Sequence, residues 1–102
     1  MTLDTTFQDD LITVRQILLD HFHDYNVKIY LFGSHARSTP RRISDIDIAI
    51  IPEQELPIDL ISEARQVLEN SNILASVDLV DLSTTSQGLF NRVMKEGVLW
   101  KG

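Results

Sequence analysis

Two aspartates, Asp45 and Asp47, are the residues of this sequence best suited to chemistry, because they stand two apart within an apolar segment. In a β-strand, residues two apart point to the same face and lie about 6.5 to 7 Å apart along the backbone. Two carboxylates that approach to about 4 Å repel each other by about 4 kcal/mol at an effective dielectric constant of 20. A cation between them removes this repulsion, and Mg²⁺ is the candidate because it prefers hard oxygen ligands.

A glycine and a serine, Gly33 and Ser34, precede these aspartates at the end of another apolar segment. Glycine lets backbone amides approach a phosphate closely, and a serine that opens a helix adds a hydroxyl and the positive helix end. Taken alone, Asp-x-Asp is more often the polar face of an edge strand, and Gly-Ser an ordinary turn with a helix cap. Here a segment with Arg37, Arg41 and Arg42 and no acid joins the two features. Together they predict a phosphate site beside a metal.

A third carboxylate is available from Asp78 or Asp81 in a later apolar run. These two residues are three apart, so they lie on opposite faces of a regular strand and at most one joins the site. Asp78 is favoured because it lies inside the run, whereas Asp81 lies near its end and is expected to help cap the last helix. Two Mg²⁺ ions, three carboxylates and a triphosphate leave about −3 charges, which the nearby arginines offset.

The apolar spacing also predicts the elements that position these residues. We expect, in chain order, a helix over 7–24 with Asp9 and Asp10 near its start, a strand over 27–32, a short helix over 34–38, a strand over 45–51, a helix over 57–70, a strand over 77–82, a helix that Ser83 or Thr84 caps and Gly97 ends, and a short extended tail at 98–99. Ile46, Ile48 and Ile50 are expected to face the core. The order α-β-(α)-β-α-β-α predicts an α/β (α+β) domain with a small sheet, and it leaves the strand directions open.

Composition limits the classes of protein to consider. A chain of 102 residues, 43% of them apolar, has room for one compact domain over 1–102. The net charge of −6 is the wrong sign for a protein that coats nucleic acid. The absence of cysteine excludes disulfides and thiol catalysis. No apolar run approaches the roughly 20 residues of a membrane span and no signal peptide opens the chain, so we expect a cytoplasmic protein away from membranes.

The combined motif resembles a known signature. Gly33-Ser34, ten intervening residues and Asp45-Ile46-Asp47 resemble the nucleotidyltransferase superfamily that includes DNA polymerase beta. The segments 31–37, 44–50 and 77–82, in that order, resemble the minimal nucleotidyltransferases, and the resemblance covers nearly the whole chain. It implies the nucleotidyltransferase fold, a small mixed β-sheet flanked by helices. It also implies transfer of a nucleoside monophosphate from a nucleoside triphosphate to a hydroxyl group.

The resemblance carries roles onto matching residues of this sequence. It implies nucleotide-binding roles for Gly33, Ser34, Arg37 and Ser44, and catalytic, metal-binding roles for Asp45, Asp47 and Asp78 around two Mg²⁺ ions. One ion would lower the pKa of the attacking hydroxyl beside Asp78, and the other would neutralise the leaving pyrophosphate. ATP is the expected donor because relatives mostly use it.

The resemblance also implies a partner chain. Larger relatives carry a second, helical domain, so a small helical HEPN-type or substrate-binding protein encoded nearby is expected to complete the site. The first hypothesis is an antitoxin that adenylylates a tyrosine of a HEPN-type toxin. The alternatives are the catalytic subunit of a two-chain transferase for a small molecule, and an antitoxin that acts by contact without catalysis. The residues leave open the acceptor, the base, and assembly with itself or with another chain.

Overall fold

The computed structural model describes residues 3–33 and 46–102, with side chains from residue 9 onward. The elements are α1 (Leu3–His21), β1 (Val27–Phe32), β2 (Ile46–Pro52), α2 (Leu60–Glu69), β3 (Val77–Asp81), the 3₁₀-helix η1 (Leu82–Thr84), α3 (Gln87–Glu96) and β4 (Val98–Lys101). This order confirms the predicted α/β class with a small sheet flanked by helices. The predicted short helix over 34–38 lies outside the described residues.

The four strands form one mixed sheet in the order β3-β2-β1-β4. β1 pairs antiparallel with β2 and with β4, whereas β2 pairs parallel with β3. The parallel pair follows from the crossover through α2, and the sequence left these directions open. β2 has a neighbour on each side, so the alternative interpretation of Asp-x-Asp as part of an edge strand is wrong.

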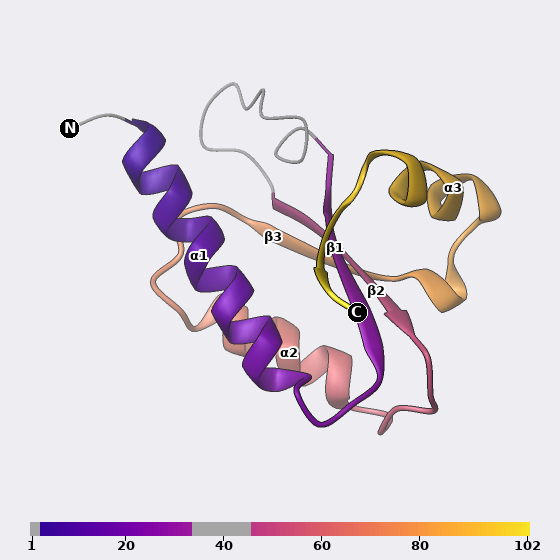
Figure 1. The fold of residues 1–102 in the computed structure, drawn as a ribbon. Helices are drawn as coiled ribbons and strands as arrows, with labels where there is room; N and C mark the ends of the chain where they lie inside the picture. The colour runs from indigo at the N-terminus through magenta and orange to yellow at the C-terminus, as the bar shows by residue number, and fades with distance from the viewer. Residues whose placement is uncertain (1–2, 34–45) are drawn as a thin grey trace.

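The main core lies on one face of the sheet, under α1 and α2 (Figure 1). Ile46, Ile48 and Ile50 of β2 are fully buried there, as their alternation predicted. α1 packs on them through Val14 and Leu18, which are also fully buried. Burying each such side chain contributes about 1.5 to 3 kcal/mol, so this cluster is what holds the helices to the sheet.

The opposite face carries a smaller cluster beneath α3, formed by Phe32, Ala49, Leu82 and Val93. In Figure 1, α3 lies on the other side of the sheet from α1 and α2. Asp47 belongs to this second face because it alternates with the buried isoleucines of β2. The Asp47 carboxylate is therefore separated from the main core by the sheet itself.

Two helix starts differ from the sequence prediction. The last helix is capped by Ser86, whose hydroxyl accepts a hydrogen bond from the Leu89 amide, and Ser83 and Thr84 belong instead to η1. The sequence offers several capping residues in a row, and Asp81 uses the earlier ones to close a 3₁₀ turn. The first helix begins at Leu3, so Asp10 lies within α1 and is buried.

The end of the chain forms a strand where a short extended tail was expected. β4 pairs with β1 through the partners Tyr30 with Leu99 and Leu31 with Val98. α3 ends at Gly97, as predicted, and Trp100 is half-buried and packs against the main core.

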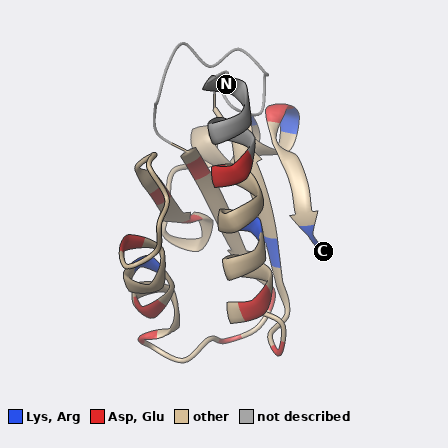
Figure 2. Ribbon diagram, turned by 90° about the vertical axis from the view of Figure 1, so that its left-hand side faces the viewer, with Lys and Arg blue, Asp and Glu red and all other residues tan. Residues whose placement is uncertain are grey.

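The described elements carry more acidic than basic residues, in line with the negative net charge of the chain. Acidic segments, red in Figure 2, recur along α1 and α2, and basic segments are fewer. Over residues 3–33 and 46–102, the structure contains no helix long and apolar enough to cross a membrane.

Candidate active site

Gly33 follows β1 and lies directly against the Asp47 carboxylate. Phe32, the residue before it, is the register partner of Asp47 on β2. Gly33 has a φ of +82°, in the left-handed region that disfavours residues with a side chain. A Cβ at this position would also collide with Oδ2 of Asp47. Both the backbone conformation and the available space therefore require glycine, and this glycine brings the end of β1 against the carboxylate.

Asp47 and Asp78 are register partners on the parallel strands β2 and β3. Neighbouring strands lie about 4.8 Å apart, and paired residues point to the same face, so the structure brings these two predicted carboxylates together. The pairing is held at its start by a hydrogen bond of 2.7 Å from the Ile46 amide to the Ser76 carbonyl. Asp47 is half-buried and Asp78 is exposed. The pair therefore combines an anchored carboxylate with an accessible one.

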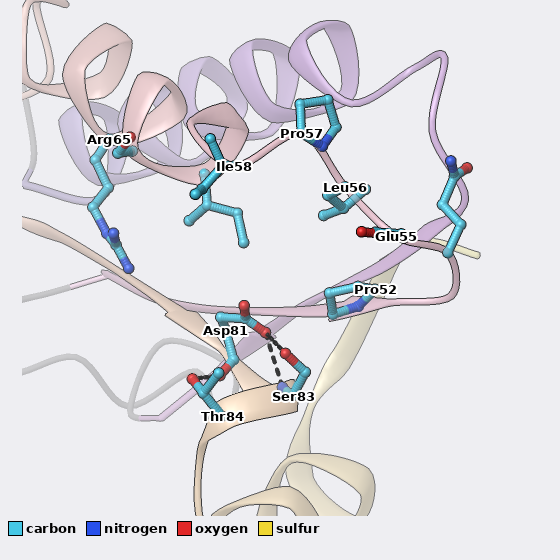
Figure 3. A pocket seen from close by; sticks show the side chains of 12 residues that line it. Pro52, Glu55, Leu56, Pro57, Ile58, Arg65, Asp81, Ser83 and Thr84 are labelled. Atoms are coloured by element: carbon cyan, nitrogen blue, oxygen red, sulfur yellow. Dashed lines mark hydrogen bonds between the residues drawn. The ribbon is translucent and has the colours of Figure 1, made fainter.

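Asp81 lies at the other end of β3, where it stabilises a turn. Its Oδ1 accepts hydrogen bonds from the Ser83 amide at 2.8 Å and from the Ser83 hydroxyl at 2.6 Å. Figure 3 shows this contact beside an open hollow of about 640 Å³ between α2, the segment after β2 and the end of β3. The selection of Asp78 over Asp81 agrees with this geometry, and Asp81 caps η1 instead of the last helix.

The remaining predicted site residues, Ser34, Arg37, Ser44 and Asp45, lie outside the described residues. Within the described ranges, no group of three or more histidine, aspartate or glutamate side chains gathers into a metal-binding cluster. The Asp47 and Asp78 pair nevertheless suits a hard divalent cation. Mg²⁺ is typically bound by one or two carboxylates together with substrate phosphates, and these two residues supply the carboxylates.

The histidines of the described region lie away from this pair. A ring nitrogen of His21, Nε2, lies 2.9 Å from the Leu60 carbonyl. His23 contacts the Asp20 carbonyl through Nδ1 at 2.8 Å and Asp24 through Nε2 at 3.1 Å. The hydrogen bond to the Asp20 carbonyl, with a smaller effect of the Asp24 charge, raises the pKa of His23 above its ordinary value. His21 thus links the end of α1 to the start of α2, whereas His23 is exposed and contacts its own turn.

One buried residue of α1 was misassigned from the sequence. Asp10, expected at a helix start, reaches across from α1 to the segment that enters β3. The signal for this contact is in the sequence, since Asp10 lies one turn before Val14 on the same apolar stripe of the helix. A single acid on an apolar stripe indicates a buried polar contact.

The chain is similar in sequence to proteins of known families. The sequence pattern of the family described as "Polymerase beta, Nucleotidyltransferase" matches residues 14–101. "Probable protein adenylyltransferase MntA" of Haemophilus influenzae is 35% identical over 81 residues, which cover 78% of this chain and 68% of that protein. "Protein adenylyltransferase MntA" of Shewanella oneidensis is 41% identical over 73 residues, or 71% of this chain. The match spans only 52% of that Shewanella protein's own length.

Solved structures match the fold over most of the chain. A chain from a crystal structure of a toxin–antitoxin with AMP-PNP has a TM-score of 0.68 and 34% identity, and the match covers 86% of this chain and 73% of that one. A second structure contains a tri-AMPylated Shewanella oneidensis HEPN toxin in complex with an MNT antitoxin. Its matching chain has a TM-score of 0.65 and 32% identity, with 93% of this chain and 71% of that one covered.

Proposed function

We propose, because this chain belongs to the polymerase beta nucleotidyltransferase family, that it transfers AMP from ATP to a tyrosine hydroxyl of a HEPN-type toxin and so acts as its antitoxin. The observation that carries the proposal is the register of Asp47 with Asp78, with Gly33 against Asp47. This arrangement suits phosphoryl transfer because it offers two carboxylates to a divalent metal at the end of a strand pair. The similarity to two protein adenylyltransferases supports a protein acceptor.

The two carboxylates have different proposed roles that follow from their exposure. Asp47, half-buried and next to Gly33, is the anchored metal ligand, and Asp45 is proposed to join it. Asp78, which is exposed, faces the incoming hydroxyl, and its carboxylate accepts the hydroxyl proton. The hydroxyl oxygen then bonds to the α-phosphorus as the bond to pyrophosphate breaks.

The donor and the metal complete the proposal. Members of this family generally use a divalent metal, and we propose two Mg²⁺ ions, held by Asp45, Asp47 and Asp78. When bound, they polarise the phosphates and neutralise the leaving pyrophosphate. Ser34, Arg37 and Ser44 are proposed to hold the triphosphate with Gly33. Arg37 would offset part of its negative charge.

The proposed partner is a small helical HEPN-type protein, present together with the chain in the cytoplasm. Support comes from the solved complex in which an MNT antitoxin, 32% identical to this chain, accompanies a tri-AMPylated HEPN toxin. A two-chain arrangement places the acceptor tyrosine on the partner, so this chain supplies the donor site and the metal ligands. Loss of the complex on gel filtration at micromolar concentration would contradict the pairing.

Intact-mass spectrometry tests the proposal directly. The protein is incubated with Mg²⁺, ATP and the helical protein encoded beside it, and the partner's mass is measured. We expect gains of one or more AMP units with the wild type and none with Asp45→Ala or Asp47→Ala. Asp81→Asn is the matched control, because it removes a carboxylate of β3 at the other end of the strand and should leave transfer intact.

Each other outcome points to a different function. An unmodified partner that stays bound to the wild type would favour neutralisation by contact. An unmodified partner together with AMP on an added small hydroxyl compound would favour the two-chain small-molecule transferase. Equal mass gains with wild type and Asp47→Ala would exclude the proposed active site.

A further inference from the structure

We propose that Asp10 is a positioning residue, which holds the start of β3 so that Asp78 stays beside Asp47. This inference rests on the proposed function, which makes the pair of Asp47 and Asp78 important. Asp10 itself lies outside both strands. Asp10 precedes residues 14–101, the part of the chain that matches the family.

The contact itself joins α1 to the segment before β3. Asp10 Oδ2 accepts a hydrogen bond from the Ala75 amide at 3.1 Å, and Oδ1 lies 3.4 Å from the Leu74 amide. Asp10 is only 7% exposed, and it is the buried charged residue among those that the structure describes. Burying a carboxylate is costly unless hydrogen bonds compensate it, so the two amides and the carboxylate hold each other in place.

The segment held by Asp10 leads directly to the active-site pair. Ser76 follows Ala75, and its carbonyl accepts the hydrogen bond from the Ile46 amide that begins the pairing of β2 with β3. Asp78 comes two residues later and lies in register with Asp47. A slip of one residue at the start of β3 would turn Asp78 to the opposite face of the sheet.

The two sides of the contact differ in how firmly they are held. On the helix side, Val14, Leu18 and Phe22 follow Asp10 at four-residue spacing and are fully buried, so the main core fixes this face of α1. On the loop side, the Leu74 side chain is 65% exposed, and its neighbours Ile73 and Ala75 pack against the main core only partly buried. Asp10 thus holds the backbone that enters β3 against a helix that the main core fixes in place.

Asp10→Asn tests the proposal, because an amide keeps one acceptor oxygen and turns an NH₂ group toward the second backbone amide. We expect about tenfold weaker Mn²⁺ binding, measured by electron paramagnetic resonance, as for other residues that orient metal ligands. Hydrogen exchange at the Leu74 and Ala75 amides should become faster. NMR contacts between β2 and β3 around Asp47 and Asp78 should weaken.

Two further variants separate positioning from general destabilisation. Val14→Ala loosens the same face of α1 one turn away without touching the loop, and it should leave Mn²⁺ affinity within about twofold of the wild type. Asp10→Glu keeps both oxygens on a longer arm and should restore part of the affinity. If Asp10→Asn fails to fold, Asp10→Glu and amide exchange in the wild type carry the test.

The proposal is overturned if Asp10→Asn leaves both the strand contacts and Mn²⁺ affinity unchanged, or if Val14→Ala weakens Mn²⁺ binding equally. Unprotected Leu74 and Ala75 amides in the wild type would also overturn it. These outcomes are distinct from failure of the proposed function, which would appear as a wild type that binds Mn²⁺ but transfers no AMP.

Discussion

The two ends of the parallel strand pair use the same residue type in opposite ways. At the site end, Asp47 and Asp78 lie side by side in register on β2 and β3, and Gly33 lies against Asp47. At the far end, Asp81 accepts two hydrogen bonds from Ser83 and closes a turn. An aspartate whose own turn supplies donors stabilises the fold, whereas one placed in register with another carboxylate is proposed to share a cation with it.

The largest expected effect is a loss of activity when Asp47, at the site end of the strand pair, is substituted. Asp47→Asn should lower AMP transfer by about 10³-fold or more, since a metal ligand contributes several kcal/mol to stabilising the transition state. Its cooperative unfolding in urea should persist, because asparagine has nearly the same shape as aspartate and the main core lies on the other face of the sheet. Transfer rates and urea unfolding curves of the same preparations check both statements. More than a tenth of the wild-type rate would be incompatible with the role of Asp47.

A substitution at Gly33 should damage both activity and stability. Gly33→Ala places a Cβ against Asp47 Oδ2 at a backbone φ of +82°. We expect a loss of about 1 to 3 kcal/mol in unfolding free energy, and a drop in transfer because the carboxylate must move.

Gly88→Ala is the matched control, since Gly88 lies in the first turn of α3 and its added Cβ would meet only Ser86 Oγ, at 3.9 Å. Alanine is favoured over glycine in a helix, so this variant should be as stable as the wild type or more stable. Equal stability of the Gly33 and Gly88 variants in urea would contradict the geometry described for Gly33.

At the far end of the strands, a substitution should alter stability alone. Asp81→Ala removes the cap of η1 and should lower the unfolding free energy by about 1 kcal/mol while transfer stays at the wild-type rate. Urea unfolding and the mass-based transfer assay measure the two effects. A tenfold loss of transfer in this variant would place Asp81 in the active site and end the contrast between the two ends.

The smallest effect concerns His23, which precedes β1 and so lies at the opposite end of that strand from Gly33. Its pKa is raised from the ordinary 6.5 by the hydrogen bond to the Asp20 carbonyl and then by the Asp24 charge. The associated stabilisation is therefore fully present below pH 6.5 and is lost as the pH rises through the higher folded pKa.

An NMR titration of His23 should show this raised midpoint, and Asp24→Asn should lower it only in part because the carbonyl contact remains. Transfer should show no corresponding dependence on His23, which His23→Gln would test. A midpoint at or below 6.5 would contradict the contacts described for His23.

Local patterns predicted much of this molecule, because they depend on neighbours in the chain. The alternation of Ile46, Ile48 and Ile50 predicted which face of β2 is buried, and Gly33 predicted the end of β1. The pairing of Asp47 with Asp78 was predicted as a shared site, and the structure brings the two together. The roles of these residues, and those of Ser34, Arg37, Ser44 and Asp45, stay predictions.

Long-range pairing accounts for what the sequence could not predict. Strand order depends on contacts between distant segments, so neither the central place of β2 nor the fourth strand followed from periodicity. The place of Asp10 on the apolar stripe of α1 indicates its burial, but not its amide partners at Leu74 and Ala75, which are remote in the chain. Ser86 caps α3 because the earlier candidates belong to the turn that Asp81 caps. The sequence alone does not show which of these candidates caps the helix.

The mixed sheet also sets an order in which the candidate site assembles during folding. β1 and β2 are close in sequence, whereas β3 joins β2 only after α2 has crossed over the sheet. Contacts between distant segments form more slowly, because closing a longer loop costs more entropy. We therefore expect Gly33 and Asp47 to meet early and Asp78 to arrive late. A partly folded chain would hold half of the carboxylate pair, so metal binding would report on completion of the fold.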